Sequence, residues 1–169
     1  FDKLAECDWI IEVVVENLKI KRQLFERIDK VRKADAIVSS NTSGIPLKDM
    51  SEGLSKGFKE HFLGTHFFNP VRWMHLLEII PGAETKQEIL DFVAEFGEKR
   101  FGKGIVWAKD TPNFIGNRIG IHGISLTINQ MLKDGLTVPE VDALFGPALG
   151  RPKTAIFATA DLVGLDTMT

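Results

Sequence analysis

The sequence predicts an α/β fold, in which a mainly parallel sheet with flanking helices is followed by a small all-α domain. Over the first two-thirds of the chain, apolar runs typical of strands alternate with segments typical of helices, and the links between them are short. After residue 112 the strand signals stop. The 169 residues leave room for one large domain or two small ones, and we expect domains at residues 1–110 and 111–169.

The predicted strands are short runs rich in β-branched residues. The first, residues 9–15, is almost continuously apolar, as expected for a buried parallel strand, and has one acidic interruption. The other predicted strands are residues 36–40, 62–68, 76–80 and 104–108.

The helices of the first domain are predicted from their apolar stripes and their capping residues. The first helix covers residues 18–33. A short helix with Pro46 in its first turn covers residues 46–54. Thr85 is expected to cap the next helix, which runs to about residue 99, with Glu88 as its capping-box partner.

The second domain is expected to be entirely helical. Residues 114–132 are predicted to form one long helix, whose glycines favour close packing against another helix, in this chain or in a partner subunit. Thr137 is expected to cap a second helix, with Glu140 three residues later. A third helix is expected at residues 155–163.

Composition argues against several functions. A formal net charge of -2 with mixed charges argues against a dedicated nucleic-acid binder. No run approaches the ~18 consecutive apolar residues of a membrane span, and no group of His, Cys and Asp has the spacing of metal ligands. Cys7 is the only cysteine, so a reducing compartment, the cytoplasm, is expected. Because the chain starts at Phe1 and reaches a strand-like run almost at once, we expect it to be a piece of a longer protein.

His66 and Glu78 are the first candidates for chemistry. Each lies in an apolar, strand-like run, and the break around Pro70 would let the two runs lie side by side. A carboxylate beside an imidazole fixes the tautomer of the ring and stabilises its protonated form, so the ring can take a proton near neutral pH. For this spacing alone the structural alternative is a buried histidine bound to a local carbonyl, with a glutamate at a strand end.

Five blocks carry a resemblance to a known family. They are Val-Glu-Asn-Leu-Lys-Ile-Lys at 15–21, Ser-Asn-Thr-Ser at 40–43, His-Phe-Phe-Asn-Pro at 66–70, Leu-Glu-Ile-Ile at 77–80 and Asp-Thr-Pro-Asn-Phe-Ile-Gly-Asn-Arg at 110–118. In order and approximate spacing the chain resembles the L-3-hydroxyacyl-CoA dehydrogenases, the NAD-dependent enzymes of fatty-acid β-oxidation. Residues 150–153 and 161–167 look most like the bacterial multifunctional or long-chain members.

The resemblance implies a role for each matched residue. His66 would take the proton of the substrate 3-hydroxyl, and Glu78 would hold and polarise the imidazole. The implied catalytic set is His66, Glu78, Ser43 and Asn117. The implied set near the nicotinamide and ribose of NAD is Glu16, Lys21, Asn41 and Ser43. Taken alone, each residue has a structural alternative, such as a helix cap for Glu16, a turn for Ser43 or an interhelical hydrogen bond for Asn117.

The same resemblance implies a fold and an activity. The first domain would be the C-terminal half of a Rossmann-like doubly wound domain, whose ligands bind outside the carboxyl ends of the strands. The activity would be NAD-dependent oxidation of (S)-3-hydroxyacyl-CoA to 3-ketoacyl-CoA, in a homodimer formed through the helical domain or in a fused multifunctional parent. The alternatives are a dehydrogenase of the same fold acting on 3-hydroxybutyryl-CoA or a small 3-hydroxy acid, and a non-catalytic dimerisation or docking module.

Two departures from the family pattern matter. The glycine-rich turn that holds the pyrophosphate is absent, as is the acidic residue for the adenine ribose. The resemblance places both upstream of Phe1, so we expect the isolated chain to be inactive or nearly so. In addition, Asn113 stands where many short-chain members have glycine.

Overall fold

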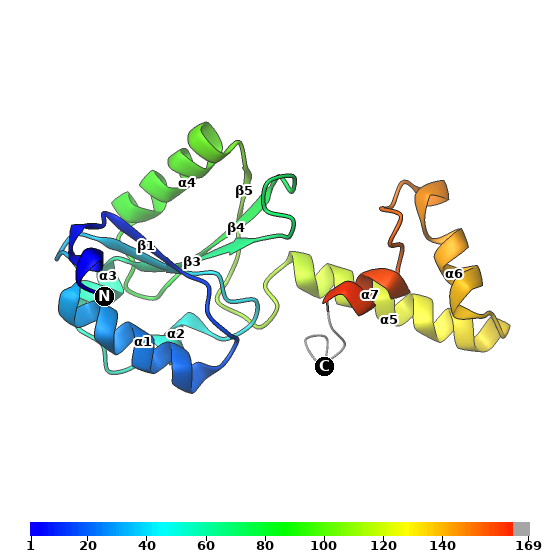
Figure 1. Ribbon diagram of the computed structural model, residues 1–169, viewed down its shortest axis with the longest axis horizontal. Coiled ribbons are helices and arrows are strands. Elements are labelled where there is room, and N and C mark those ends of the chain that lie inside the picture. The colour runs from blue at the N-terminus through cyan, green and yellow to red at the C-terminus, as the bar shows by residue number, and fades with distance from the viewer. Residues whose placement is uncertain (164–169) are drawn as a thin grey trace. The chain divides into compact units, whose positions relative to one another are not determined.

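The computed structural model describes residues 1–163 (Figure 1). The chain forms two compact units, Phe1–Ile115 and Gly116–Thr169. The resemblance to bacterial multifunctional or long-chain members rests partly on residues 161–167. Of these, residues 164–167 lie outside the described residues.

The first unit is built on a five-stranded sheet in the order β1-β2-β3-β4-β5. Its strands are β1 (Trp9–Glu12), β2 (Ile37–Ser40), β3 (Phe62–Phe67), β4 (Leu76–Pro81) and β5 (Gly104–Trp107). The first three strands are parallel, β4 is antiparallel to β3, and β5 is parallel to β4. The carboxyl ends of β1, β2 and β3 therefore share one edge of the sheet with the start of β4.

Helices cover both faces of this sheet, as the doubly wound fold requires (Figure 1). On one face lie α1 (Leu18–Val31), α2 (Leu47–Met50) and α3 (Lys56–Glu60), where the rings of Phe25, Phe58 and Phe62 pack with centroids 5.1 to 5.7 Å apart. On the other face lies α4 (Gln87–Phe101), which buries Leu90 and Val93. The short 3-10 helix η1 (Asp2–Glu6) precedes β1. The predicted α/β fold is confirmed.

The described part of the second unit is helical, with α5 (Gly116–Asp134), α6 (Val138–Leu144), the 3-10 helix η2 (Pro147–Leu149) and α7 (Phe157–Val163). Thr137 is the N-cap of α6, as predicted, and its backbone N–H donates to the carboxylate of Glu140 at 2.7 Å in a capping box. Asp142 of α6 accepts three backbone N–H groups at the start of α7. Within residues 1–163, no helix combines the length and apolar character needed to cross a bilayer.

Three local predictions in the first unit are wrong. The first strand ends at Glu12 instead of residue 15, because the N–H of Val14 donates to the carboxylate of Glu12 at 2.6 Å and leaves the strand ladder. Thr85 does not cap α4; its hydroxyl accepts the N–H of Gly82 and donates to the carbonyl of Phe62, which closes the turn after β4. The helix expected at residues 46–54 is shorter, because α2 ends at Met50, and α3, capped by Ser55, is a separate helix beyond that range.

Candidate active site

His66 and Glu78 face each other across two adjacent antiparallel strands. They are register partners in β3 and β4, and Nδ1 of His66 lies 2.7 Å from Oε2 of Glu78, with both side chains buried. A carboxylate only accepts hydrogen bonds, so the ring proton of this pair is on Nδ1 and Nε2 is an acceptor in the neutral ring. The two apolar runs therefore do lie side by side, as the sequence indicated.

The other ring nitrogen of His66 faces a hydroxyl group. Oγ of Ser43, on the loop after β2, lies 3.3 Å from Nε2. The rings of Phe68 and Phe114 pack against the imidazole, with centroids at 4.5 and 5.5 Å. The imidazole is thus held in one orientation between aromatic rings, with its accepting nitrogen directed at Ser43.

Glu78 is held by a second contact through its other oxygen. The backbone N–H of Ile115 donates to Oε1 at 3.0 Å. The segment that carries Ile115 is anchored at Asp110, whose two carboxylate oxygens accept the N–H groups of Leu47 at 2.8 Å and Lys48 at 3.2 Å. Asn113 within this segment has φ +60°, a left-handed conformation that asparagine tolerates better than most residues. This conformation explains how asparagine can occupy the position at which many short-chain members of the family that the sequence resembles have glycine.

Glu16 binds the loop that carries Ser43. Its Oε1 accepts hydrogen bonds from the Thr42 hydroxyl at 2.5 Å and from the N–H groups of Ser43 at 2.9 Å and Gly44 at 3.2 Å. Partial burial raises the pKa of Glu16, but these hydrogen bonds and the ammonium of Lys21 outweigh burial, so its pKa lies below the ordinary 4.5. Glu16 is therefore a charged anchor for this loop at neutral pH.

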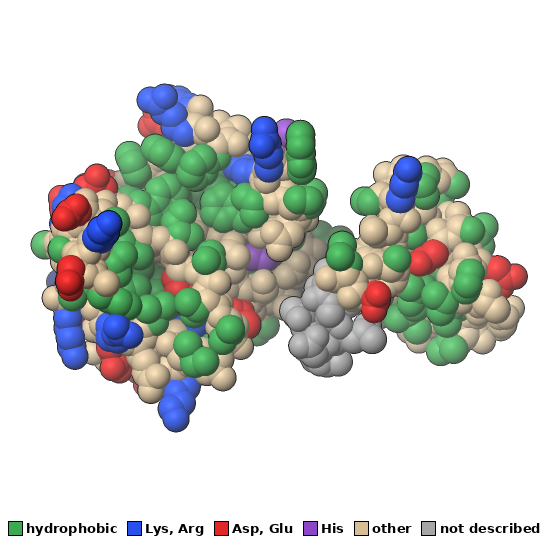
Figure 2. All heavy atoms as spheres, in the orientation of Figure 1, with side chains coloured by type: hydrophobic (Ala, Val, Ile, Leu, Met, Phe, Trp, Pro, Cys, Tyr) green, Lys and Arg blue, Asp and Glu red, His purple; other side chains and the backbone are tan. Residues whose placement is uncertain are grey.

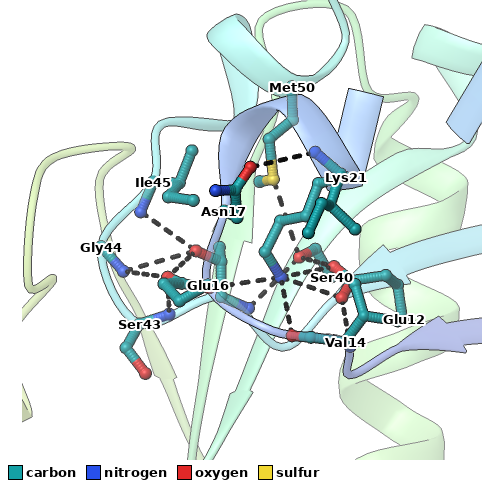
Figure 3. Close-up of polar contacts among 12 residues, drawn as sticks. Glu12, Val14, Glu16, Asn17, Lys21, Ser40, Ser43, Gly44, Ile45 and Met50 are labelled. Carbon is teal, nitrogen blue, oxygen red and sulfur yellow. Dashed lines mark hydrogen bonds and ion pairs between the residues drawn. The ribbon is translucent and has the colours of Figure 1, made fainter. Parts of the chain in front are cut away.

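Lys21 is buried, with only 1% of its side chain exposed, and it pairs with two carboxylates. Its ammonium lies 2.8 and 2.9 Å from the two carboxylate oxygens of Glu12 and 3.2 Å from Glu16 (Figure 3). Sequence reasoning missed Glu12, which it took for an interruption of an apolar strand. The signal was available, because a carboxylate in a buried strand needs a cationic partner.

Asn41 also makes a backbone contact, since its side-chain oxygen accepts the N–H of Phe67 at 2.9 Å at the end of β3. The same residue lines a groove of about 860 Å³ at the carboxyl edge of the sheet, on the side of α4. Its walls are both apolar and polar, and the lining residues include Ile11, Val13, Asn41, Phe67, Asn69 and Arg72. Figure 2 shows that hydrophobic side chains gather on the surface between β1 and α4.

The structure brings together most, but not all, of the predicted site residues. His66, Glu78, Ser43 and Glu16 form one connected set in the first unit. Asn117 lies in the first turn of α5, in the second unit. Its approach to the histidine stays a prediction, as do the contacts of Glu16, Lys21 and Asn41 with a cofactor.

A largely parallel sheet with helices on both faces is the architecture of dinucleotide-binding domains, and the histidine–glutamate pair lies at the edge where such sheets bind their ligands. Comparison with known families agrees. Residues 1–111 match the NAD binding domain of 3-hydroxyacyl-CoA dehydrogenase, and residues 114–169 match the C-terminal domain of the same enzyme. The chain belongs to the 3-hydroxyacyl-CoA dehydrogenase family.

Three relatives illustrate the match. A probable 3-hydroxyacyl-CoA dehydrogenase of Bacillus subtilis is 60% identical over 98% of this chain and 21% of its own length. A putative fatty acid oxidation complex trifunctional enzyme of Rickettsia prowazekii is 42% identical over 99% of this chain and 23% of its own length. The crystal structure of (S)-3-hydroxybutyryl-CoA dehydrogenase from Ralstonia eutropha superposes with a TM-score of 0.86, at 32% identity, over 99% of this chain and 58% of that one. The chain thus spans between a fifth and three-fifths of these proteins.

Proposed function

We propose that the protein oxidises (S)-3-hydroxyacyl-CoA to 3-ketoacyl-CoA with NAD, and that the chain described here supplies the catalytic base. The observation that carries this proposal is the sequence of contacts from Glu78 through His66 to Ser43. A buried carboxylate lies 2.7 Å from one imidazole nitrogen, and a hydroxyl lies 3.3 Å from the other. This is the geometry of a general base held by a carboxylate, with a hydrogen-bonding group beside it.

In the proposed reaction Nε2 of His66 takes the proton of the substrate 3-hydroxyl, so that the C3–O bond becomes a carbonyl. The positive charge that develops on the ring is stabilised by Glu78, which faces Nδ1. The hydroxyl of Ser43 can hydrogen-bond to the same substrate oxygen, and in the reverse direction it helps to hold the 3-keto oxygen. When bound, NAD accepts the hydride that leaves C3.

The donor set at the sheet edge fits the nicotinamide half of NAD. Asn41 and Asn69 line a groove with both apolar and polar walls at the carboxyl ends of the strands, which is where such sheets bind their ligands. The sequence itself lacks a glycine-rich turn for the pyrophosphate. We therefore propose that these residues hold the nicotinamide and its ribose, and that the adenine half is held elsewhere in the complete protein.

The test is the substitution His66→Gln in the full-length protein, with His61→Gln as a matched control. His61 is also buried, but its ring contacts the carbonyl of Gly57 at 2.9 Å, outside the candidate site. Turnover should fall by about 10² to 10⁴ in the first variant, since a general base contributes that much, and should persist in the second. Unchanged turnover in a folded His66→Gln protein would favour a non-catalytic docking or dimerisation module.

A dehydrogenase that acts on 3-hydroxybutyryl-CoA is a second candidate, supported by the structural similarity to the Ralstonia enzyme. Comparing kcat/KM for C4 and longer acyl-CoA substrates separates the two.

Dimerisation through the helical unit is a further proposal, supported by the exposed Ile119, Leu126 and Leu132 of α5. A fused multifunctional parent is supported by the Rickettsia relative, and a cytoplasmic location by the single Cys7.

A further inference from the structure

The carboxylate of Glu12 is buried completely at the end of β1, with 0% of its side chain exposed. Its two oxygens receive hydrogen bonds from the Val14 N–H at 2.6 Å, from the Ser40 hydroxyl at 2.6 Å and from the Lys21 ammonium at 2.8 and 2.9 Å. Figure 3 shows these donors converging on the carboxylate from the end of β1, from β2 and from α1. Such a group stays buried only because every oxygen has charged or polar partners.

Lys21 connects the buried Glu12 to Glu16, which binds the loop that carries Ser43. Its buried ammonium is shared between Glu12 and Oε2 of Glu16, which lies at 3.2 Å. The other oxygen of Glu16 accepts the N–H groups of Ser43 and Gly44. A chain of contacts therefore runs from the buried Glu12 to the loop whose serine lies 3.3 Å from Nε2 of His66.

The charges along this chain of contacts determine how Lys21 and Glu16 respond when Glu12 is replaced. Two carboxylates share one buried ammonium, and Glu12 makes the shorter contacts. Without the charge of Glu12, the ammonium has one carboxylate left, and it draws Glu16 toward itself because an unpaired buried charge is costly. Glu16 can move inward only by loosening its hydrogen bonds to the amides of Ser43 and Gly44.

We propose that Glu12 is a positioning residue for Ser43, acting through Lys21 and Glu16. This inference rests on the proposed function, in which Ser43 contacts the substrate oxygen beside His66. A displacement of about 1 Å in such a group can cost on the order of 100-fold in rate. Glu12→Gln should accordingly lower kcat by about 10- to 100-fold and change KM little.

The experiment is a double-mutant cycle in the full-length protein with Glu12→Gln, Ser43→Ala and the two together. If Glu12 acts through Ser43, its substitution costs about 10- to 100-fold with Ser43 present and less than about threefold in the Ser43→Ala background, since coupled residues are not additive. Equal losses in both backgrounds, or no loss at all, would overturn the inference. Absence of turnover in the wild-type protein would instead refute the proposed function.

A matched control is Asp29→Asn. Asp29 accepts the backbone N–H and the hydroxyl of Ser55 and pairs with Arg32 at 3.4 Å, so it too is a partly buried anchoring carboxylate. Its substitution should lower the melting temperature and have the same effect on kcat in both Ser43 backgrounds. Hydrogen exchange adds a readout without turnover: the amides of Ser43 and Gly44 should exchange about tenfold faster in Glu12→Gln and remain unchanged in Asp29→Asn.

A second comparison applies if Glu12→Gln alone does not fold. Substituting Lys21→Met together with Glu12→Gln removes the ammonium that would be left unpaired, and such paired replacements are often tolerated. Because the influence of Glu12 passes through Lys21, this double variant should match Lys21→Met alone in kcat within about twofold. A further loss in the double variant would show that Glu12 does not act through Lys21.

Discussion

The backbone N–H of Ile115 donates to Oε1 of Glu78 at 3.0 Å, while Oε2 of the same carboxylate faces Nδ1 of His66 at 2.7 Å. Both neighbours are hydrogen-bond donors, and they approach different oxygens of the Glu78 carboxylate. The carboxylate that orients the proposed base is therefore fixed in turn by the segment that follows β5.

Glu78→Gln should lower kcat by about 10² to 10⁴ with little change in KM. A glutamine offers one acceptor and one donor where the structure requires two acceptors, so either Ile115 or His66 loses its partner. The loss appears in kcat because the carboxylate stabilises a charge that develops only in the transition state. Steady-state kinetics in the full-length protein check this, and an effect confined to KM would point to a binding role.

Asp110→Ala should lower the free energy of unfolding by about 1–2 kcal/mol, as for loss of a helix cap, because two N–H groups at the start of α2 lose their acceptor. It should also lower kcat, since the anchor of the segment bearing Ile115 is gone. Urea denaturation and kinetics measure the two effects. Glu52→Ala is the control, because Glu52 has an exposed ion pair with Arg22 near the same helix and its removal should change neither quantity appreciably.

Stability should depend on pH through Glu16. Its pKa in the folded protein lies below the ordinary 4.5, so the charged form contributes stability that is present above that value and is lost as the pH falls through the lower folded pKa. The difference in unfolding free energy between the wild type and Glu16→Gln should therefore shrink with acidification. Urea titrations at neutral pH and below 4.5 test this, and a constant difference would contradict it.

Asp142→Ala should destabilise the helical unit by about 1–2 kcal/mol, the usual effect of losing a cap. Asp142 accepts the N–H groups of Ile156, Phe157 and Ala158 at 3.1, 2.8 and 3.1 Å, and an alanine side chain has no acceptor to offer them. Asp134→Ala serves as the control, since that carboxylate accepts a hydrogen bond from the exposed side chain of Gln130 on the same helix. Equal stability of the two variants would show that α7 does not depend on this contact.

The sequence was sufficient to predict the contact between His66 and Glu78, because both residues lie in strand-like runs separated by a short break. The antiparallel direction of β4 was within reach as well: the eight-residue connection from 68 to 75 is too short for a parallel crossover. The predicted first strand was too long at its C-terminal end. Apolar character alone does not show that the Glu12 side chain accepts the backbone N–H of Val14 and so ends the strand.

Periodicity places Lys21 on the buried face of α1, four residues before Phe25 and seven before Ile28. It does not show that the partner of this ammonium is Glu12, because that contact depends on how the first turn of α1 packs over the end of β1. Likewise, the contact between Ile115 and Glu78 depends on the path of an irregular segment with two left-handed residues, which no regular pattern encodes.

The pairing of β3 with β4 determines which insertions and deletions the His66–Glu78 pair can tolerate. Side chains alternate between the faces of a strand, so inserting or deleting one residue inside either strand would turn His66 or Glu78 to the opposite face and abolish the pair. The connection between the strands lies outside the ladder and can grow or shrink without altering that register. Natural variation in this family should therefore accumulate in the connecting loop, while the residue count from the end of the loop to the glutamate stays constant.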